Sequence, residues 1–206
     1  MTCLNASNPE TYRLMESFYT IQGEGIHAGR AAYFIRLGGC DVRCWWCDVK
    51  DSWDAEAHPE VEAREIARRA TESGANLAVI TGGEPLLHDL TALSRELHRE
   101  GLEVHLETSG SSPLRGEIDW VTLSPKRFKK PVDDIFSVVD ELKVVVLTRK
   151  DLAWAEENEA RCSSRTHLSL QPEWDTPESI PLIIDYVKTH PQWQVSLQTH
   201  KFMQIP

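Results

Sequence analysis

Short apolar runs alternate along the chain with segments whose apolar residues recur at helical spacing. In one such segment, near residues 59–73, Ala63, Ile66 and Ala70 share a face, Pro59 suits the first helical turn and Gly74 follows the end. Further helices are predicted at residues 89–100, around 150–158 and within 177–188. The apolar runs predict strands at residues 13–20, 32–37, 77–80, 102–106, 118–123, 142–147, 168–170 and 194–197.

This alternation predicts an α/β fold with a mainly parallel sheet and right-handed crossovers. About six parallel strands are fewer than the eight that close a full barrel, so we expect a partial, open TIM-like (βα) barrel. The chain has 206 residues, of which 41% are hydrophobic, and no composition shift marks a boundary. We therefore predict one domain over residues 1–206.

Three cysteines, Cys40, Cys44 and Cys47, lie close together after the second predicted strand. Three thiolates can hold a four-iron cluster and leave one iron open to a substrate or cofactor, whereas a ferredoxin-type site ligates every iron and only transfers electrons. The spacing thus favours catalysis at a cluster bound by a loop of about residues 38–54. Zinc is the alternative, because Asp48 or His58 could supply a fourth ligand.

Polar residues follow the ends of several predicted strands. Thr-Gly-Gly-Glu-Pro at 81–85 follows the apolar run 77–80, and its paired glycines allow a close backbone approach beside the Glu84 carboxylate. Glu107, Ser124 and Gln171 follow other strands. Any one of these segments alone is typical of a plain turn. Because the carboxyl ends of parallel strands meet at one rim, together they predict a ligand pocket.

The cysteine spacing, followed by Gly-Gly-Glu-Pro, resembles the radical S-adenosylmethionine (SAM) superfamily. The resemblance implies a [4Fe-4S] cluster on Cys40, Cys44 and Cys47, whose open iron chelates SAM. It implies no catalytic side chain, because the cluster-bound SAM delivers the radical. The residues that it places at SAM are Thr81, Gly82, Gly83, Glu84, Ser124, Lys126 and Gln171.

Further motifs narrow the resemblance: Gln-Gly-Glu-Gly at 22–25, Glu-Thr-Ser-Gly at 107–110, Ser-Pro-Lys at 124–126 and Gln-Thr-His-Lys at 198–201. Together they resemble the family of 7-carboxy-7-deazaguanine synthases over residues 22–206. This implies a ring contraction of 6-carboxy-5,6,7,8-tetrahydropterin to 7-carboxy-7-deazaguanine, with release of ammonia, in queuosine and 7-deazapurine biosynthesis. Carboxylates suit the guanidine-like pterin edge, and cations suit its acid. The implied substrate site is Gln22, Glu24, Arg36, Glu107, His200 and Pro206.

Magnesium is a further cofactor that the family resemblance implies. Family members commonly have threonine directly after Cys-Asp, and its hydroxyl binds a Mg²⁺ ion that also meets the substrate carboxylate. This chain has Val49 after Asp48, and valine offers no oxygen. The Mg²⁺ site is then absent, relies on substrate and water oxygens, or recruits Asp48, Asp51 or Ser52. We predict that activity depends less on Mg²⁺ here than in the family.

Composition and the two remaining cysteines limit which partners and which cellular location the sequence predicts. The net charge of −10 argues against nucleic acid. No apolar run reaches about 18 residues and residues 1–10 lack a signal peptide's apolar core, which predicts a cytoplasmic protein without membrane contact. Cys3 and Cys162 are then ordinary free thiols.

Trp45 and Trp46 shield the cluster, stack near adenine or anchor the core. The resemblance implies a flavodoxin- or ferredoxin-type reductant and a homodimer.

Two alternative functions differ in class from this one. A radical SAM activase, which generates a glycyl radical on a partner protein, shares the cysteine spacing, although the Gln-Gly-Glu-Gly and Gln-Thr-His-Lys motifs argue against it. A non-catalytic module that binds zinc or an iron–sulfur cluster would give a colourless metal-bound protein or would not cleave SAM.

Overall fold

One curved sheet organises residues 10–206, which are the residues that the computed structural model describes. Its strands are β1 (Thr11–Ile21), β2 (Ala31–Leu37), β3 (Glu60–Glu62), β4 (Leu77–Gly82), β5 (Glu103–Thr108), β6 (Trp120–Leu123), β7 (Glu141–Val146), β8 (His167–Pro172) and β9 (Trp193–Val195). Their order is β3-β1-β2-β4-β5-β6-β7-β8-β9. β1 pairs antiparallel with both of its neighbours, and every other pairing is parallel.

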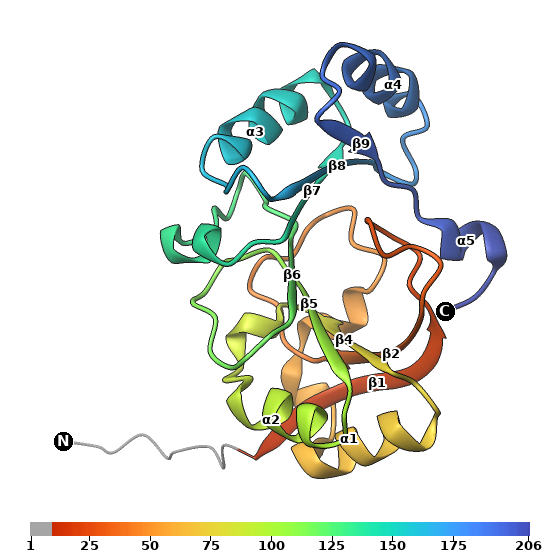
Figure 1. Ribbon diagram of the computed structural model, residues 1–206, viewed down its shortest axis with the longest axis vertical. Coiled ribbons are helices and arrows are strands. Elements are labelled where there is room, and N and C mark those ends of the chain that lie inside the picture. The colour runs from red at the N-terminus through yellow and green to blue at the C-terminus, as the bar shows by residue number, and fades with distance from the viewer. Residues whose placement is uncertain (1–9) are drawn as a thin grey trace.

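Four helices cover the convex face of the sheet: α1 (Ala63–Glu72), α2 (Thr91–Arg99), α3 (Arg149–Glu159) and α4 (Ser179–Thr189). Figure 1 shows the sheet bending into an open barrel, with the short helix α5 (Thr199–Met203) at the open side of the curve. The predicted α/β fold with a partial barrel is confirmed. Its parallel part consists of β2 and β4 to β9, which is close to the number of strands that the sequence predicts.

Three details of the sequence prediction were wrong. Residues 60–62 do not begin a helix but pair with β1 as β3, and the amide of Leu14 also bonds the carbonyl of Pro59 (3.0 Å). The helix therefore begins at Ala63. The last strand lies at residues 193–195 and not 194–197. The short helix α5 was not predicted, because five residues carry too little periodicity to reveal a helix.

The hydrophobic core lies between the sheet and its outer helices. Ile66 and Ala70 of α1 and Leu93 and Leu97 of α2 are fully buried there, as the helical spacing predicts. Along β5, Leu106 belongs to this core. Because successive side chains of a strand face opposite sides, the residues between the core positions face the concave side, and many of them are polar. This arrangement provides the polar interior in which the site is built.

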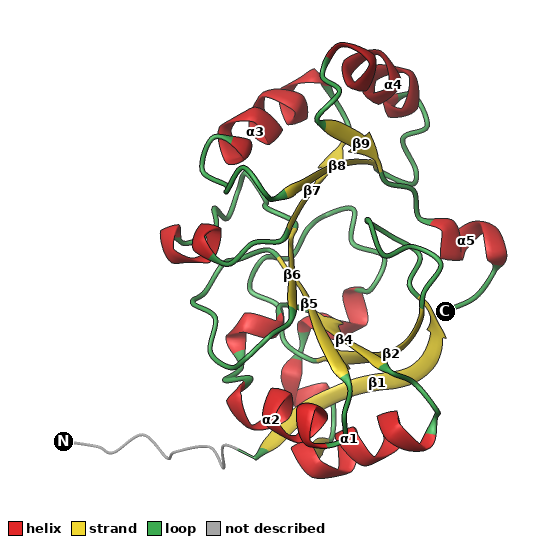
Figure 2. Cartoon of the chain, in the orientation of Figure 1, coloured by secondary structure: helices red, strands yellow, loops and turns green. Residues whose placement is uncertain are grey.

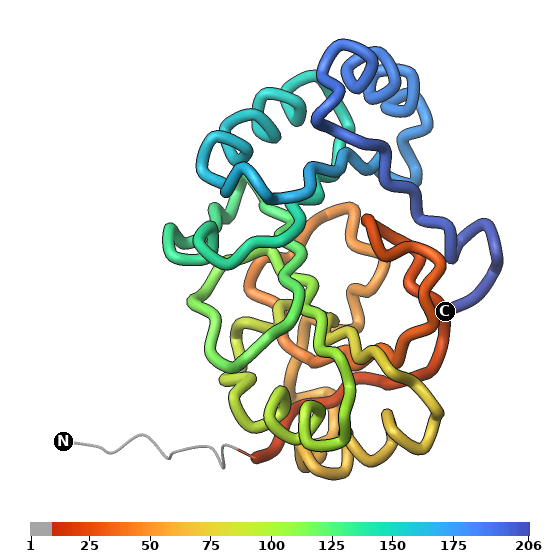
Figure 3. Tube along the Cα trace, viewed as in Figure 1, coloured from red at the N-terminus to blue at the C-terminus, as the bar shows by residue number. Residues whose placement is uncertain are grey.

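Loops fill much of the space that the sheet encloses (Figure 2). The tube in Figure 3 shows the C-terminal segment returning beside the N-terminal part of the chain. Two hydrogen bonds fix this return, from the amide of Thr199 to the carbonyl of Gly23 (2.9 Å) and from the hydroxyl of Thr20 to the carbonyl of Pro206 (3.1 Å). Among residues 10–206, no helix has the length and apolar character needed to span a bilayer.

Candidate active site

The loop that carries the three cysteines runs from the end of β2 into a short 3₁₀ helix at Lys50–Trp53. Its two ends are joined by main-chain hydrogen bonds from Gly39 to Ser52 (2.6 Å) and from Cys40 to Trp53 (3.2 Å). An ion pair between Asp41 and Lys129 ties the loop to the segment after β6. The loop is thus a closed unit held against the sheet.

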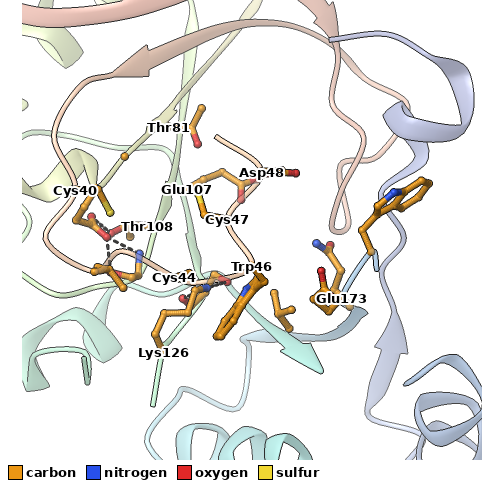
Figure 4. A pocket seen from close by; sticks show the side chains of 18 of the residues that line it. Cys40, Cys44, Trp46, Cys47, Asp48, Thr81, Glu107, Thr108, Lys126 and Glu173 are labelled. Carbon is orange, nitrogen blue, oxygen red and sulfur yellow. Dashed lines mark hydrogen bonds between the residues drawn. The ribbon is translucent and has the colours of Figure 1, made fainter. Parts of the chain in front are cut away.

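Cys40, Cys44 and Cys47 are half-buried and line one cavity of about 220 Å³. Figure 4 shows them on one loop at the cavity, which Trp46, Thr81, Glu107 and Lys126 also line. Burial raises the pKa of the Cys44 thiol, and Lys126 opposes that shift. Three thiols that converge on a roomy cavity fit a [4Fe-4S] cluster with one iron open to a ligand.

The Gly-Gly-Glu-Pro turn at the end of β4 packs directly on the cysteine loop. A Cβ atom on Gly83 would lie 2.1 Å from the carbonyl oxygen of Gly39 and 3.0 Å from the Cβ atom of Cys40. Gly82 has φ +127°, and a Cβ there would lie 2.2 Å from the carbonyl oxygen of Leu37. The paired glycines are therefore required by the close approach of two backbones.

The Glu84 carboxylate is 1% exposed and already fully hydrogen-bonded. One oxygen accepts from the hydroxyl of Thr108 and the amide of Leu86 (3.0 Å), and the other accepts from the hydroxyl and amide of Ser109 (2.8 Å for the amide). A carboxylate offers about four lone-pair positions, so these four donors saturate it. Glu84 therefore joins the end of β4 to the end of β5, and the main chain of the turn is what can face a ligand.

Six of the seven residues predicted at SAM line the cysteine cavity: Thr81, Gly83, Glu84, Ser124, Lys126 and Gln171. Gly82 lines the neighbouring cavity instead. The Lys126 ammonium donates to the carbonyl and hydroxyl oxygens of Ser124 (2.8 and 2.6 Å), and burial lowers its pKa. Gln171 accepts from the hydroxyl of Ser196 (2.9 Å). Amide, hydroxyl and ammonium groups thus converge beside the cysteines.

A second cavity, of about 190 Å³, contains all six residues predicted at the substrate: Gln22, Glu24, Arg36, Glu107, His200 and Pro206. Its wall includes residues that also line the cysteine cavity, among them Cys47, Thr81 and Glu107. The two cavities are therefore neighbours that share part of their lining. A ligand in the second cavity would lie against a ligand in the first.

Lys143 is a residue of this site that the sequence analysis missed. Its side chain is 3% exposed and its ammonium contacts Glu24 (2.5 Å) and Glu107 (2.6 Å). Burial alone would raise the pKa of Glu24. The charge of Lys143 and the hydrogen bonds that Glu24 accepts lower this pKa to about 2 instead. The signal was a lone charged residue inside the apolar run 142–147.

Two glycines of the Gln-Gly-Glu-Gly motif make room for other side chains of the site. A Cβ atom on Gly23 would lie 2.3 Å from Nδ1 of His200. Gly25 has φ +66°, and its Cβ atom would lie 2.5 Å from the buried carboxylate of Glu141. Burial lowers the pKa of His200, and the charge of Glu24 opposes this. The Gln-Gly-Glu-Gly motif at 22–25 and the Gln-Thr-His-Lys motif at 198–201 therefore lie against each other.

The residues near Asp48 offer few free side-chain oxygens to a Mg²⁺ ion. The Asp48 carboxylate pairs with the ammonium of Lys201 (2.8 Å), which also lies 4.9 Å from the centre of the Trp174 ring. Val49 supplies no side-chain oxygen, and Ser52 is fully buried with its hydroxyl donated to the carbonyl of Val49 (2.6 Å). Lys201 thus already pairs with Oδ2 of Asp48 and would compete with Mg²⁺ for this carboxylate.

The two tryptophans between the cysteines differ in their surroundings. Trp45 is 67% exposed, so it does not anchor the core. Trp46 lines the cysteine cavity and packs edge-on against Trp45 and Phe128. Cys162 is half-buried away from the site, and burial raises its pKa to about 11. Cys3 lies outside the described residues.

Comparison with known proteins agrees with this geometry. The Radical SAM superfamily model matches residues 34–145, from β2 through the cysteine loop into β7. The fold and the cysteine cavity are therefore those of a radical SAM enzyme, and this membership confirms the predicted [4Fe-4S] cluster and SAM. Neither the activase nor the zinc module is favoured.

Curated relatives narrow the class further. A 7-carboxy-7-deazaguanine synthase from Flavobacterium psychrophilum is 51% identical, over 96% of this chain and 94% of that protein. One from a Synechocystis species is 47% identical, over 95% and 94%. The crystal structure of QueE from Escherichia coli matches with a TM-score of 0.82 and 29% identity, covering 91% of this chain and 93% of that one. This chain belongs to the 7-carboxy-7-deazaguanine synthase family.

Proposed function

We propose that this chain converts 6-carboxy-5,6,7,8-tetrahydropterin to 7-carboxy-7-deazaguanine with release of ammonia. The observation that carries the proposal is the adjacency of two cavities, one lined by the three cysteines and the other by residues that include Glu24, Glu107, an arginine and a histidine. A hydrogen atom can move between two ligands only when they are in contact. Thr81 and Glu107 line both cavities, so ligands bound in the two cavities would lie next to each other.

The cluster and SAM, when bound, supply abstraction of a hydrogen atom from the substrate. The protein's own groups hold SAM: main-chain atoms of Thr81 and Gly83 take its amino group, because the Glu84 carboxylate is saturated. Polar groups of two other strands take its carboxylate and ribose, namely Ser124 and Lys126 after β6 and Gln171 near the end of β8. Trp46 covers this side and excludes water.

On the substrate side, carboxylates and amides bind the nitrogen-rich edge of the pterin. Glu24 and Glu107 accept its N–H groups, and Gln22 orients Glu107 through a hydrogen bond of 3.0 Å. Arg36 supplies a cation for the substrate carboxylate, and His200, whose pKa is lowered by burial, supplies an imidazole N–H donor. The terminal residue Pro206 closes the same cavity.

The test is anaerobic reconstitution with iron and sulfide, followed by SAM, a chemical reductant and the tetrahydropterin. Mass spectrometry should find 7-carboxy-7-deazaguanine. The matched negative control is Cys44→Ser, which lacks one thiolate of the triad. Formation of 5′-deoxyadenosine without the deazaguanine would keep the superfamily assignment and contradict the substrate.

We also propose the wider setting of the reaction. The exposed Trp45 brings the cysteine loop to the surface, which supports electron delivery by a flavodoxin- or ferredoxin-type protein. The end strand β9 carries the exposed Val195, next to Leu197, which supports a homodimer. A catalytic domain of residues 1–206, with a cluster loop at about residues 38–54, then works in the cytoplasm, where reducing conditions keep the thiols free, and without a nucleic-acid partner.

A further inference from the structure

Lys143 places one buried cation between two carboxylates that come from different parts of the chain. Lys143 lies on β7, Glu107 near the end of β5, and Glu24 in the segment between β1 and β2. The ammonium is 2.5 Å from Oε2 of Glu24 and 2.6 Å from Oε2 of Glu107. The side chain is 3% exposed, so the contact is shielded from water.

The other oxygen of each carboxylate is held by a glutamine amide. Gln22 donates to Oε1 of Glu107 (3.0 Å), and Gln198 donates to Oε1 of Glu24 (2.8 Å). A carboxylate offers about four lone-pair positions, so Glu107 with two of these donors, and Glu24 with two and a further hydrogen bond from Gln171, still have a lone pair for a ligand. The plane of each carboxylate is fixed at both ends before any ligand arrives.

The charge count explains why a cation is needed. Two carboxylates that share a buried site without a cation cannot both ionise easily, and one takes up a proton. With Lys143 present, the cluster of three groups carries one net negative charge. Its carboxylates raise the pKa of Lys143 against the effect of burial, so the ammonium stays charged.

We propose that Lys143 is a positioning residue, which keeps Glu24 and Glu107 ionised and fixed in direction so that together they accept N–H groups from one planar substrate edge. This inference rests on the proposed function, since the guanidine-like edge of a pterin supplies such N–H groups. An edge that presents only acceptors would meet two anions and be rejected. Lys143 thereby sets specificity without touching the substrate.

The test is equilibrium binding of 6-carboxypterin, the oxidised relative of the proposed substrate, to reconstituted enzyme with SAM between about pH 6 and pH 9. In the wild type, Lys143 keeps both carboxylates ionised, so their protonation should not change the binding affinity over this pH range. Lys143→Met should bind about 10- to 100-fold more weakly near pH 6, the effect of one lost charge-assisted hydrogen bond. Its affinity should recover as the pH rises, because the shared proton then leaves.

Other titratable groups lie near the carboxylate pair: Lys126, His105 and His200. Lys143 itself helps to lower the pKa of Lys126, so the pH profile of Lys143→Met is compared with that of a variant that keeps the cation as well as with that of the wild type. Lys143→Arg keeps the cation and should stay within about fivefold of wild type with the wild-type profile. Lys150→Met removes an exposed lysine of α3 and is the matched control.

Each outcome decides between the alternatives. A Lys143→Met variant that is weaker by the same factor at every pH, or not weaker at all, overturns the inference, because a purely structural lysine would behave so. If that variant does not fold, Lys143→Gln carries the same loss of charge and gives the same test. Wild type that fails to bind 6-carboxypterin contradicts the proposed function instead.

Discussion

Replacing Gly83 with alanine tests whether the Gly-Gly-Glu-Pro turn holds the cysteine loop in place. The new Cβ atom would lie 2.1 Å from the carbonyl oxygen of Gly39, whereas ordinary contacts begin near 3.4 Å, so the two backbones must separate by about 1 Å. That movement breaks the hydrogen bonds from Gly83 to Leu37 (2.9 Å) and from Glu84 to Gly39 (2.8 Å). At about 1–3 kcal/mol for each bond left unmade, we expect a loss of about 2–6 kcal/mol.

Urea unfolding of the apoprotein measures this loss, and iron and sulfide analysis after reconstitution measures cluster binding. Gly83→Ala should lose both stability and iron, because the Cβ atom would also meet Cys40. Gly101→Ala is the matched control: its φ is +81° and its Cβ atom would meet nothing within 4 Å, so it should cost only about 1–2 kcal/mol and bind iron normally. If Gly83→Ala matched this control in stability and iron content, the packing argument would be refuted.

Three further predictions concern other groups. Added Mg²⁺ should change the rate of chelator-treated enzyme by less than about twofold, because Lys201 already pairs with Asp48; a large stimulation in a steady-state assay would contradict this. Glu84→Gln should lower the free energy of unfolding by about 2–4 kcal/mol, since an amide NH₂ would face donors; an unchanged urea midpoint would show that the four hydrogen bonds contribute little. Alkylation of Cys162 at about pH 8, followed by peptide mapping, should be much slower in the native than in the unfolded protein, because its raised pKa leaves little thiolate below pH 11; equal rates would exclude that shift.

The outer half of the fold was predictable because the physical cause of each element is local. Apolar runs such as 77–80 and helical faces such as that of Ala63 and Ile66 report burial directly, and the structure buries them against each other. β3 was not predictable in this way. Its three residues carry no periodicity, and pairing with β1 makes them a strand.

The residues on the concave side of the sheet could not be predicted in the same way. Lys143 lies in a strand that looks almost continuously apolar, since its neighbours Leu142 and Val144 belong to the core. A buried charged residue is costly unless it is paired, so its presence in such a strand indicates a partner. The sequence does not say which residue that partner is, because Glu24 is 119 positions away.

The Gln-Gly-Glu-Gly and Gln-Thr-His-Lys motifs are likewise brought together by contacts between distant parts of the chain. Gly23 and His200 are far apart in sequence, but a Cβ atom on Gly23 would lie 2.3 Å from the imidazole of His200. Gln198 donates to Glu24 (2.8 Å), and Thr199 bonds the carbonyl of Gly23 through its amide and its hydroxyl (2.9 Å each). Each motif therefore supplies the space and the hydrogen-bond partners that the other needs. The second cavity lies where residues 22–24 and residues 198–200 pack together, which explains why neither motif alone reveals it.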